Sequence, residues 1–172
     1  MRAAPPKRAY GAIWGVFVAV LLFALLFILV TTPGLPDMVA SHFNAAGQPS
    51  SYMPRGRYLR FMLAMAVGLP VAIVVLLSAV YSRAQNLKLP NRQYWLAPQR
   101  IGRTRALLIA HGVWFGIMLC VLTCFVHWLE LAANRSLPPH LSNGAFGIGL
   151  LVFLIAMAVW IGALMVSFRR MS

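Results

Sequence analysis

Acidic residues are almost absent from this chain. Asp37 and Glu130 are the only two among 172 residues, against 15 lysines and arginines. All charged residues together make up 10% of the sequence, whereas soluble domains carry about 25%. The shortage of charge therefore argues against a soluble globular domain and for a membrane protein.

Cysteine is scarce, and the common enzyme signatures are missing. Cys120 and Cys124 lie four residues apart in an apolar run, which places them on the same side of a helix. They lack the C-x2-C spacing of a metal knuckle, so we expect buried thiols. The sequence also contains no G-x-S-x-G element and no glycine-rich phosphate loop with a lysine. An enzyme is therefore the less favoured interpretation.

Long apolar runs are what the chain has in abundance. Hydrophobic residues make up 61% of it, and a helix needs about 20 apolar residues to cross a bilayer core of about 30 Å. The first run is longer than the apolar part of a cleaved signal peptide, which favours a retained helix. The sequence predicts an all-α, polytopic four-transmembrane-helix bundle, a single integral membrane domain over residues 1–172. The predicted spans are residues 10–30, 58–80, 106–129 and 145–168.

Proline and glycine predict local features of these helices. Pro70 near the middle of the second span predicts a kink. Pro98 suits the first position of the third helix, where its missing N–H costs nothing. In the fourth span, Gly147, Gly149 and Gly162 favour close helix contact. Alternatively, Gly144, Gly147 and Gly149 indicate a loosely ordered start of that helix.

The distribution of Lys and Arg predicts the orientation. Eleven of the 15 lie at the two termini and in the basic loop 81–105, which the positive-inside rule places in the cytoplasm. The loop 31–57 and the loop 130–144 then face outward. We expect the basic loop to contact anionic phospholipid headgroups, with another membrane protein or a second copy of the chain as the alternative partner. The net charge of +13 comes with no nucleic-acid-binding motif, so no nucleic acid is expected.

This topology gathers titratable side chains at the outer side. His127 and Glu130 are three residues apart and hence neighbours on a helix, and His42 and His140 lie in the outer loops. Three interpretations remain open. One is a zinc or other divalent metal site formed by His42, His127 and Glu130; another is a proton or cation relay; the third is a purely structural role. Apart from such a metal, no cofactor is expected.

Two motifs carry a family resemblance. Residues 35–49 read L-P-D-M-V-A-S-H-F-N-A-A-G-Q-P and residues 90–100 read P-N-R-Q-Y-W-L-A-P-Q-R. The first resembles the opening signature of the domain of unknown function 1648, and the second resembles a stretch seen in many of its members. The motif residues in the outer loop are Pro36, Asp37, His42, Phe43, Asn44 and Gly47. Those in the basic loop are Pro90, Asn91, Arg92, Tyr94, Trp95, Pro98 and Arg100.

The resemblance implies a location and a range of roles. The same domain occurs in SdpI-like immunity proteins, which implies the bacterial cytoplasmic (inner) membrane. It favours a small non-enzymatic protein of envelope signalling or immunity, or an accessory subunit of a membrane complex. The alternative is a metal-dependent membrane enzyme or an ion-conducting protein that uses the outer His and Glu residues.

The first motif also has a physical interpretation. Asn44 and Gly47 suit a tight turn, in which glycine adopts a positive φ without steric cost. Phe43 is expected to anchor the loop in the outer end of the bundle, and His42 is expected near Glu130 or His127. The loop then either fixes the structure or recognises an extracytoplasmic ligand.

Overall fold

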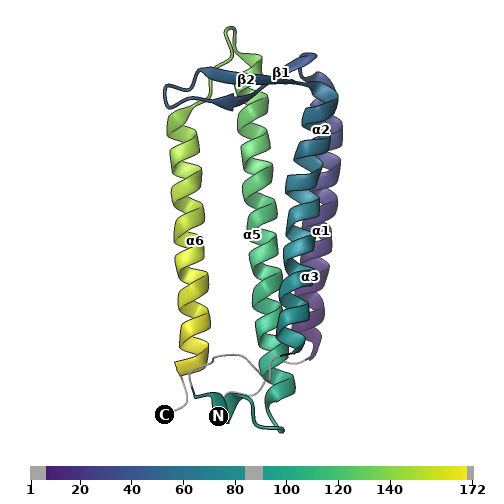
Figure 1. The fold of residues 1–172 in the computed structure, drawn as a ribbon, viewed down its shortest axis with the longest axis vertical. Helices are drawn as coiled ribbons and strands as arrows, with labels where there is room; N and C mark the ends of the chain where they lie inside the picture. Colours follow the sequence, from purple (N-terminus) through teal and green to yellow (C-terminus); the bar gives the residue numbers. More distant parts are fainter. Residues whose placement is uncertain (1–6, 84–90, 170–172) are drawn as a thin grey trace.

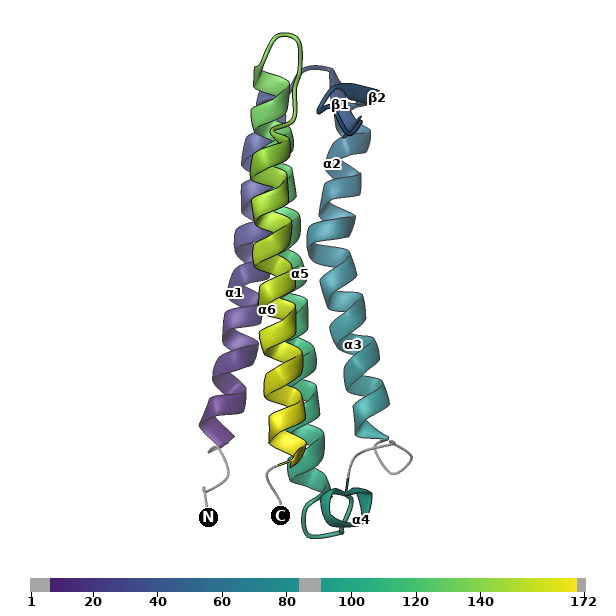
Figure 2. The same ribbon diagram turned by 90° about the vertical axis from the view of Figure 1, so that its left-hand side faces the viewer.

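Four long helices stand side by side in the computed structural model, which describes residues 7–83 and 91–169 (Figure 1). All four are long and apolar enough to cross a membrane, which confirms the predicted all-α membrane class. α1 begins and α6 ends at the end of the bundle where α4 lies (Figures 1 and 2). The helices are α1 (Lys7–Thr31), α2 (Arg55–Leu63), α3 (Leu69–Ser82), α4 (Arg92–Trp95), α5 (Ile101–Arg135) and α6 (Asn143–Arg169).

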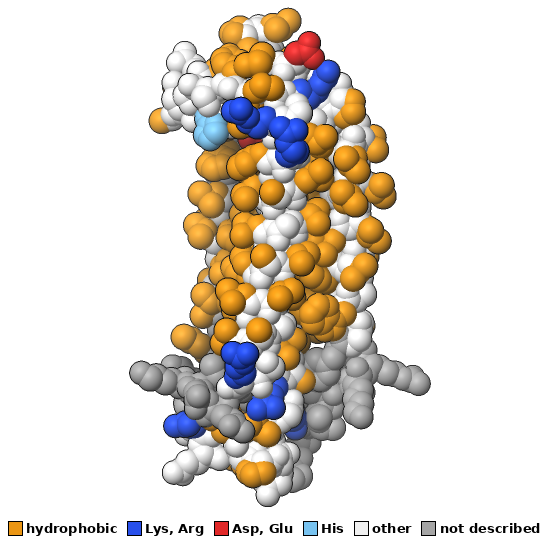
Figure 3. All heavy atoms as spheres, turned by 45° about the vertical axis from the view of Figure 1, so that its right-hand side comes forward, with side chains coloured by type: hydrophobic (Ala, Val, Ile, Leu, Met, Phe, Trp, Pro, Cys, Tyr) orange, Lys and Arg blue, Asp and Glu red, His pale blue; other side chains and the backbone are white. Residues whose placement is uncertain are grey.

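A hydrophobic belt surrounds the bundle between two basic ends. In Figure 3 the hydrophobic side chains cover the middle of the visible face, and the Lys and Arg side chains lie above and below it. Many large apolar side chains in this belt are exposed, such as Phe23, Val75 and Leu151. An exposed apolar surface of this extent suits the hydrocarbon of a bilayer.

Two threonines and a proline end α1. The hydroxyls of Thr31 and Thr32 donate to the carbonyls of Phe27 and Ile28, at 2.6 and 2.7 Å. These side chains bind carbonyls of the last turn, and Pro33 follows in a short 3-10 turn (Thr32–Gly34). The chain therefore leaves the helix at the expected position.

α2 and α3 form one spanning helix with an irregularity before Pro70. The predicted kink takes the form of a π-helical turn over Ala64–Gly68, and Pro70 lies in the first turn of α3. Because proline has no N–H, the carbonyl one turn earlier loses its usual donor, and the backbone adopts the wider turn there.

A β-hairpin caps one end of the bundle, and it was not predicted. β1 (Met38–Phe43) pairs antiparallel with β2 (Pro49–Pro54), with Val39 opposite Met53 and Phe43 opposite Pro49. The register shifts on both sides of His42. We call this the hairpin end of the bundle, and the opposite one the α4 end.

α5 is the central helix, and two of its glycines admit neighbouring helices. A Cβ at Gly116 would lie 2.5 Å from Val74 Cγ2 and 3.1 Å from the ring of Phe17. A Cβ at Gly112 would lie 3.3 Å from Leu77. This G-x-x-x-G pair lets α1 and α3 pack closely on α5.

α6 packs more loosely. A Cβ at Gly149 would meet the ring of Phe125, so this glycine makes the predicted close contact. Gly147 and Gly162 have nothing within 4 Å of such a Cβ, so the prediction fails for them. No residue is buried in the most apolar 18-residue stretch of α6, whereas 44% of the residues in the corresponding stretch of α5 are buried.

The bounds of α5 correct two predictions. The helix begins at Ile101, after the separate turn of α4, so Pro98 is not its first residue. At the other end it continues to Arg135, so Glu130 and Asn134 lie in its last turns and not in a loop. A helix of 35 residues is about 50 Å long and exceeds a hydrocarbon core of about 30 Å. Pro90 lies outside the described residues.

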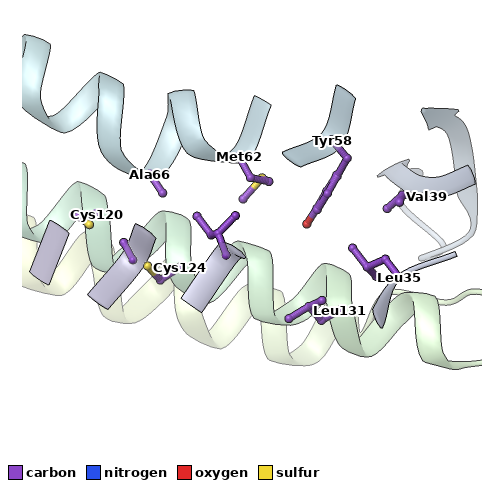
Figure 4. Packing of buried hydrophobic residues seen from close by; sticks show 10 residues of the cluster. Leu35, Val39, Tyr58, Met62, Ala66, Cys120, Cys124 and Leu131 are labelled. Atoms are coloured by element: carbon purple, nitrogen blue, oxygen red, sulfur yellow. The ribbon is translucent and has the colours of Figure 1, made fainter. Parts of the chain in front are cut away.

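The main core lies near the hairpin end, between α1, α2 and α5. It contains Ala24, Ile28, Met62, Cys120 and Cys124, and the two cysteines are buried free thiols as predicted. Figure 4 shows Met62 and Tyr58 projecting from α2, with the hydroxyl oxygen of Tyr58 directed toward α5.

Candidate functional site

A chain of four polar side chains crosses this core, and we call it the buried polar chain. The Tyr58 hydroxyl donates to Glu130 Oε2 at 2.6 Å and lies 2.8 Å from His127 Nδ1. His127 Nε2 lies 2.8 Å from Thr31 Oγ1, which donates to the Phe27 carbonyl. Tyr58 and His127 are fully buried, and Glu130 is 9% exposed. The chain thus links α1, α2 and α5 through hydrogen bonds.

Two proton arrangements satisfy every bond of the buried polar chain. In one, Glu130 is a carboxylate that accepts from Tyr58, and His127 donates from both ring nitrogens. In the other, Glu130 carries a proton and donates it to Tyr58, and Tyr58 donates to a neutral His127. Both arrangements hold the same number of protons, because a carboxylic acid and a neutral imidazole replace a carboxylate and an imidazolium. The geometry therefore permits a proton to pass between Glu130 and His127 through one hydroxyl.

Asn134 attaches the hairpin to the helix that carries Glu130. Its side-chain oxygen accepts from Ala40 N at 2.8 Å, and its Nδ2 donates to Ala40 O at 3.0 Å and to Glu130 O at 2.8 Å. The Asn134 side-chain amide thus binds both backbone groups of Ala40, as a residue of a neighbouring strand would. It covers the edge of β1 that β2 leaves open.

The tip of the hairpin is held by Asn44 and Gly47, as the sequence predicts. Asn44 Oδ1 accepts from the N–H groups of Ala46 and Gln48, both at 2.9 Å. Gly47 has φ +77°, and a Cβ there would lie 2.5 Å from the Leu141 carbonyl oxygen. Both the conformation and the close approach therefore require glycine.

His42 lies on the exposed side of the hairpin. Its Nδ1 is 3.0 Å from Ser51 Oγ and 3.2 Å from Ser41 Oγ. Its hydrogen bonds with described residues go to these serines and not to His127. His42 therefore does not form the expected contact with Glu130 or His127. It only borders the same pocket as Glu130.

This pocket, which we call the hairpin pocket, has a volume of about 480 Å³. It lies between the hairpin, α5 and the start of α6, and Glu130, His42 and Asn44 are among the polar residues that border it. Its size falls in the range of small-molecule sites, about 300–1,000 Å³. Its apolar walls include Phe43, Val126, Leu129, Leu141 and Phe146.

The predicted metal site is not assembled as a set of three ligands. Among the described residues no group of three or more His, Cys, Asp or Glu side chains is arranged to hold a metal ion. His127 and Glu130 both bind Tyr58, whereas His42 binds serine hydroxyls. The structure therefore gives no support to zinc shared by these three residues.

The other residues of the first motif shape the entry to the hairpin. Asp37 forms a salt bridge with Arg55 at 2.9 Å, and Arg55 also donates to the Leu35 and Pro33 carbonyls. Asp37 is almost fully exposed, and such surface pairs contribute only about 0–1 kcal/mol. Pro36 is exposed beside them, and Phe43 is half-buried in the wall of the hairpin pocket.

The second motif forms the α4 end, at the opposite end of the bundle from this site (Figure 2). Trp95 is buried against Phe168, to whose carbonyl its indole N–H donates at 3.3 Å. Trp95 therefore connects α6 to α5, because its carbonyl also accepts from the Thr104 hydroxyl at 2.8 Å.

The Arg100 guanidinium lies 3.7 Å from the centre of the Tyr94 ring. Asn91 precedes α4 in the left-handed conformation. Arg92 and Pro98 border a second pocket, of about 570 Å³.

Sequence reasoning found His127 and Glu130 and missed three residues of the site. Tyr58 was expected only as the start of a helix, and an interfacial tyrosine is common enough to hide such a role. Thr31 and Asn134 were not singled out. A sequence signal for Thr31 and Tyr58 does exist. They lie at the same end of two adjacent spans as the His-x-x-Glu pair of the third span.

The fold defines a polytopic α-helical membrane protein. Residues 19–67 match the family model of a domain of unknown function, DUF1648, which confirms the resemblance given by the first motif. The matched segment runs from α1 through the hairpin into the π-helical turn, and it includes Thr31 and Tyr58 but not His127 or Glu130. No curated protein and no solved structure matches the chain.

Proposed function

We propose that this protein is a non-enzymatic membrane receptor or immunity protein that binds an extracytoplasmic ligand in the hairpin pocket. The observation that carries the proposal is the position of Glu130. Glu130 is 9% exposed and borders an apolar pocket, and it forms no salt bridge with a described residue. A titratable carboxyl group that is buried beside an apolar pocket, and that reaches His127 only through the Tyr58 hydroxyl, is costly to maintain for stability alone.

The construction of the pocket supports recognition. One wall belongs to the DUF1648-matched hairpin and the other to α5 and α6. Asn134 and Asn143 tie the two walls together through the Ala40 backbone and the Ala45 carbonyl. A ligand between these walls would therefore contact both parts of the chain. This arrangement suits signalling or immunity, the roles that the resemblance implies.

Ion conduction across the bilayer is the less favoured alternative. The buried polar chain ends at the Phe27 carbonyl. Toward the α4 end the adjoining core is apolar and contains Ala24, Ala66 and Cys120. A transmembrane proton path needs polar groups or water at each step. The buried polar chain therefore suits a local role, and residues 7–83 and 91–169 contain no assembled ligand set to favour a metal-dependent reaction.

The proposal places the hairpin end outside the bacterial cytoplasmic membrane. The α4 end, with Arg92, Arg100 and Arg103, then faces the cytoplasm and its anionic lipid headgroups. Single-cysteine variants Leu137→Cys and Gln93→Cys test this orientation in a Cys120→Ala, Cys124→Ala background. Leu137 is 95% exposed at the hairpin end, so a membrane-impermeant maleimide applied to intact cells should label it and not Gln93. Labelling of Gln93 alone would reverse the orientation.

Site-specific photocrosslinking tests ligand recognition. A benzophenone amino acid at Phe43 faces the hairpin pocket, and the same amino acid at Tyr52 stands on the exposed part of β2. We expect a captured molecule at Phe43 and not at Tyr52. Leu141→Trp, which fills the pocket, should abolish the capture, whereas Leu137→Trp in the same loop should not. Equal capture at both positions, or capture unaffected by Leu141→Trp, would contradict the proposal.

A further inference from the structure

We propose that the hairpin pocket selects ligands that carry an alkylammonium group on an apolar body, with the cation bound at Glu130 Oε1. This inference rests on the proposed function and specifies the chemical class of its ligand. The group is the same whether it belongs to a small amphiphilic amine or to a lysine side chain of an apolar peptide.

The two oxygens of Glu130 have different surroundings. Oε2 accepts the hydrogen bond from Tyr58 at 2.6 Å. Oε1 makes no hydrogen bond with the residues that the structure describes, and it is not among their fully buried unpaired atoms. Since Glu130 borders the hairpin pocket, Oε1 is the oxygen that remains available to a ligand. A carboxylate oxygen with a free acceptor site binds an N–H donor of opposite charge most strongly.

Aromatic side chains complete the environment of a cation. Phe43 from the hairpin and Phe146 from α6 border the same pocket as Glu130. The faces of aromatic rings attract ammonium groups, and the attraction grows when water is excluded. Val126, Leu129 and Leu141 supply apolar surface for the rest of the ligand. A carboxylate, two phenyl rings and aliphatic walls together match an amphiphilic ammonium better than a carboxylate or a neutral alcohol.

The arginines at this end do not neutralise Glu130. Arg55 is paired with Asp37, and Arg57, Arg60 and Arg135 are exposed and form no salt bridge with Glu130. Because these three side chains are exposed, salt screens their repulsion of a cation bound at Oε1. His42 is held at Nδ1 by serine hydroxyls on the hairpin.

The test compares three probes of equal length on the full chain in lipid nanodiscs: octylammonium, octanol and octanoate, each with a diazirine on the alkyl chain. Peptide mapping by mass spectrometry measures labelling of residues 41–45 and 141–146. We expect octylammonium to label these residues at concentrations about tenfold or more below those of the other two probes, as suits a hydrogen bond to a charged group. Glu130→Gln, which keeps an acceptor for Tyr58, should remove this preference, so that octylammonium labels no better than octanol.

The outcomes separate this inference from the function on which it rests. Equal labelling by all three probes that Leu141→Trp abolishes would keep the pocket as a binding site and overturn the ammonium preference. Preference for octanoate would overturn it as well. Absence of pocket labelling by any probe would overturn both. Should Glu130→Gln fail to fold, Phe43→Leu with the same probes decides, because loss of the ring should weaken octylammonium labelling and spare octanol.

A peptide pair distinguishes the two sources of the cation. The acetylated and amidated peptide Leu-Leu-Lys-Leu-Leu competes with octylammonium if the pocket accepts a lysine side chain, and its norleucine counterpart does not. Competition by the lysine peptide alone assigns a peptide ligand. Competition by neither assigns a small amine. Equal competition by both peptides contradicts recognition of the charge.

Discussion

The Tyr58 hydroxyl on α2 lies 2.6 Å from Glu130 Oε2 on α5, and the bond is buried. The two residues are 72 positions apart in the chain. Since Tyr58 also contacts His127, one hydroxyl links two titratable groups of α5 to the helix that follows the hairpin. The site therefore depends on the packing of α2 against α5.

Tyr58→Phe should destabilise the protein. The variant leaves Oε2 of Glu130 and Nδ1 of His127 without their partner, and each unpaired buried group costs about 1–3 kcal/mol. Unfolding in mixed micelles should show this loss, whereas Tyr52→Phe, at an exposed position, should leave the free energy of unfolding unchanged. Equal stability of the two variants would show that the buried polar chain contributes nothing.

Occupation of the hairpin pocket by octylammonium should change the protonation of His127. A cation at Glu130 favours the carboxylate arrangement, in which His127 donates from both ring nitrogens. ¹⁵N spectra of histidine-labelled protein should then move both His127 signals toward the imidazolium positions. Glu130→Gln should remove the response, and the signals of His111, near the α4 end of α5, should stay unchanged. An unaltered His127 in the ammonium-bound protein would contradict coupling through Tyr58.

Asn134→Ala should release β1 from α5. The Ala40 N–H and C=O both lose their partner, so hydrogen exchange at Ala40 should accelerate, by about fivefold or more for a hydrogen bond of about 1 kcal/mol. Asn143→Ala removes a different bond, to the Ala45 carbonyl at the hairpin tip. It should leave the exchange at Ala40 unaltered.

Gly47→Ala should weaken the attachment of the hairpin tip to the loop before α6. A left-handed conformation costs a non-glycine residue about 1–2 kcal/mol, and the added Cβ would also clash with the Leu141 carbonyl. Thermal unfolding should register the loss. Gly144→Ala, where a Cβ meets nothing within 4 Å, is the matched control and should not lower the stability.

Gly116→Ile should separate α3 from α5. The new side chain would overlap Val74 and Phe17, and overpacking of this kind costs about 1–3 kcal/mol. Gly147→Ile introduces the same side chain on α6 in open space, so its effect on the unfolding midpoint should be small. A larger loss for Gly147 than for Gly116 would reverse this account of the packing.

The spans were predictable because apolar length alone fixes them. The predicted span 145–168 differs from α6 by two residues at its start and one at its end, and the turn at Asn44 and Gly47 follows from local chemistry. The strands beside that turn pair with each other, but an isolated two-stranded hairpin is marginal, and Asn134, which covers the edge of β1, lies 94 residues away. No local pattern carries such a partner. Likewise, the spacing of His127 and Glu130 predicts neighbours on a helix, but only helix packing brings Tyr58 between them.

The unequal burial of α5 and α6 has a consequence for assembly in the membrane. Helices insert first and associate afterwards, and the buried contacts of α5 are with α1 and α3 across Gly112 and Gly116. These three spans therefore pack together without α6, which contacts them at points such as Gly149 and Phe168. Until it docks, the hairpin pocket lacks one wall. The proposed binding site is therefore complete only when α6 is in place.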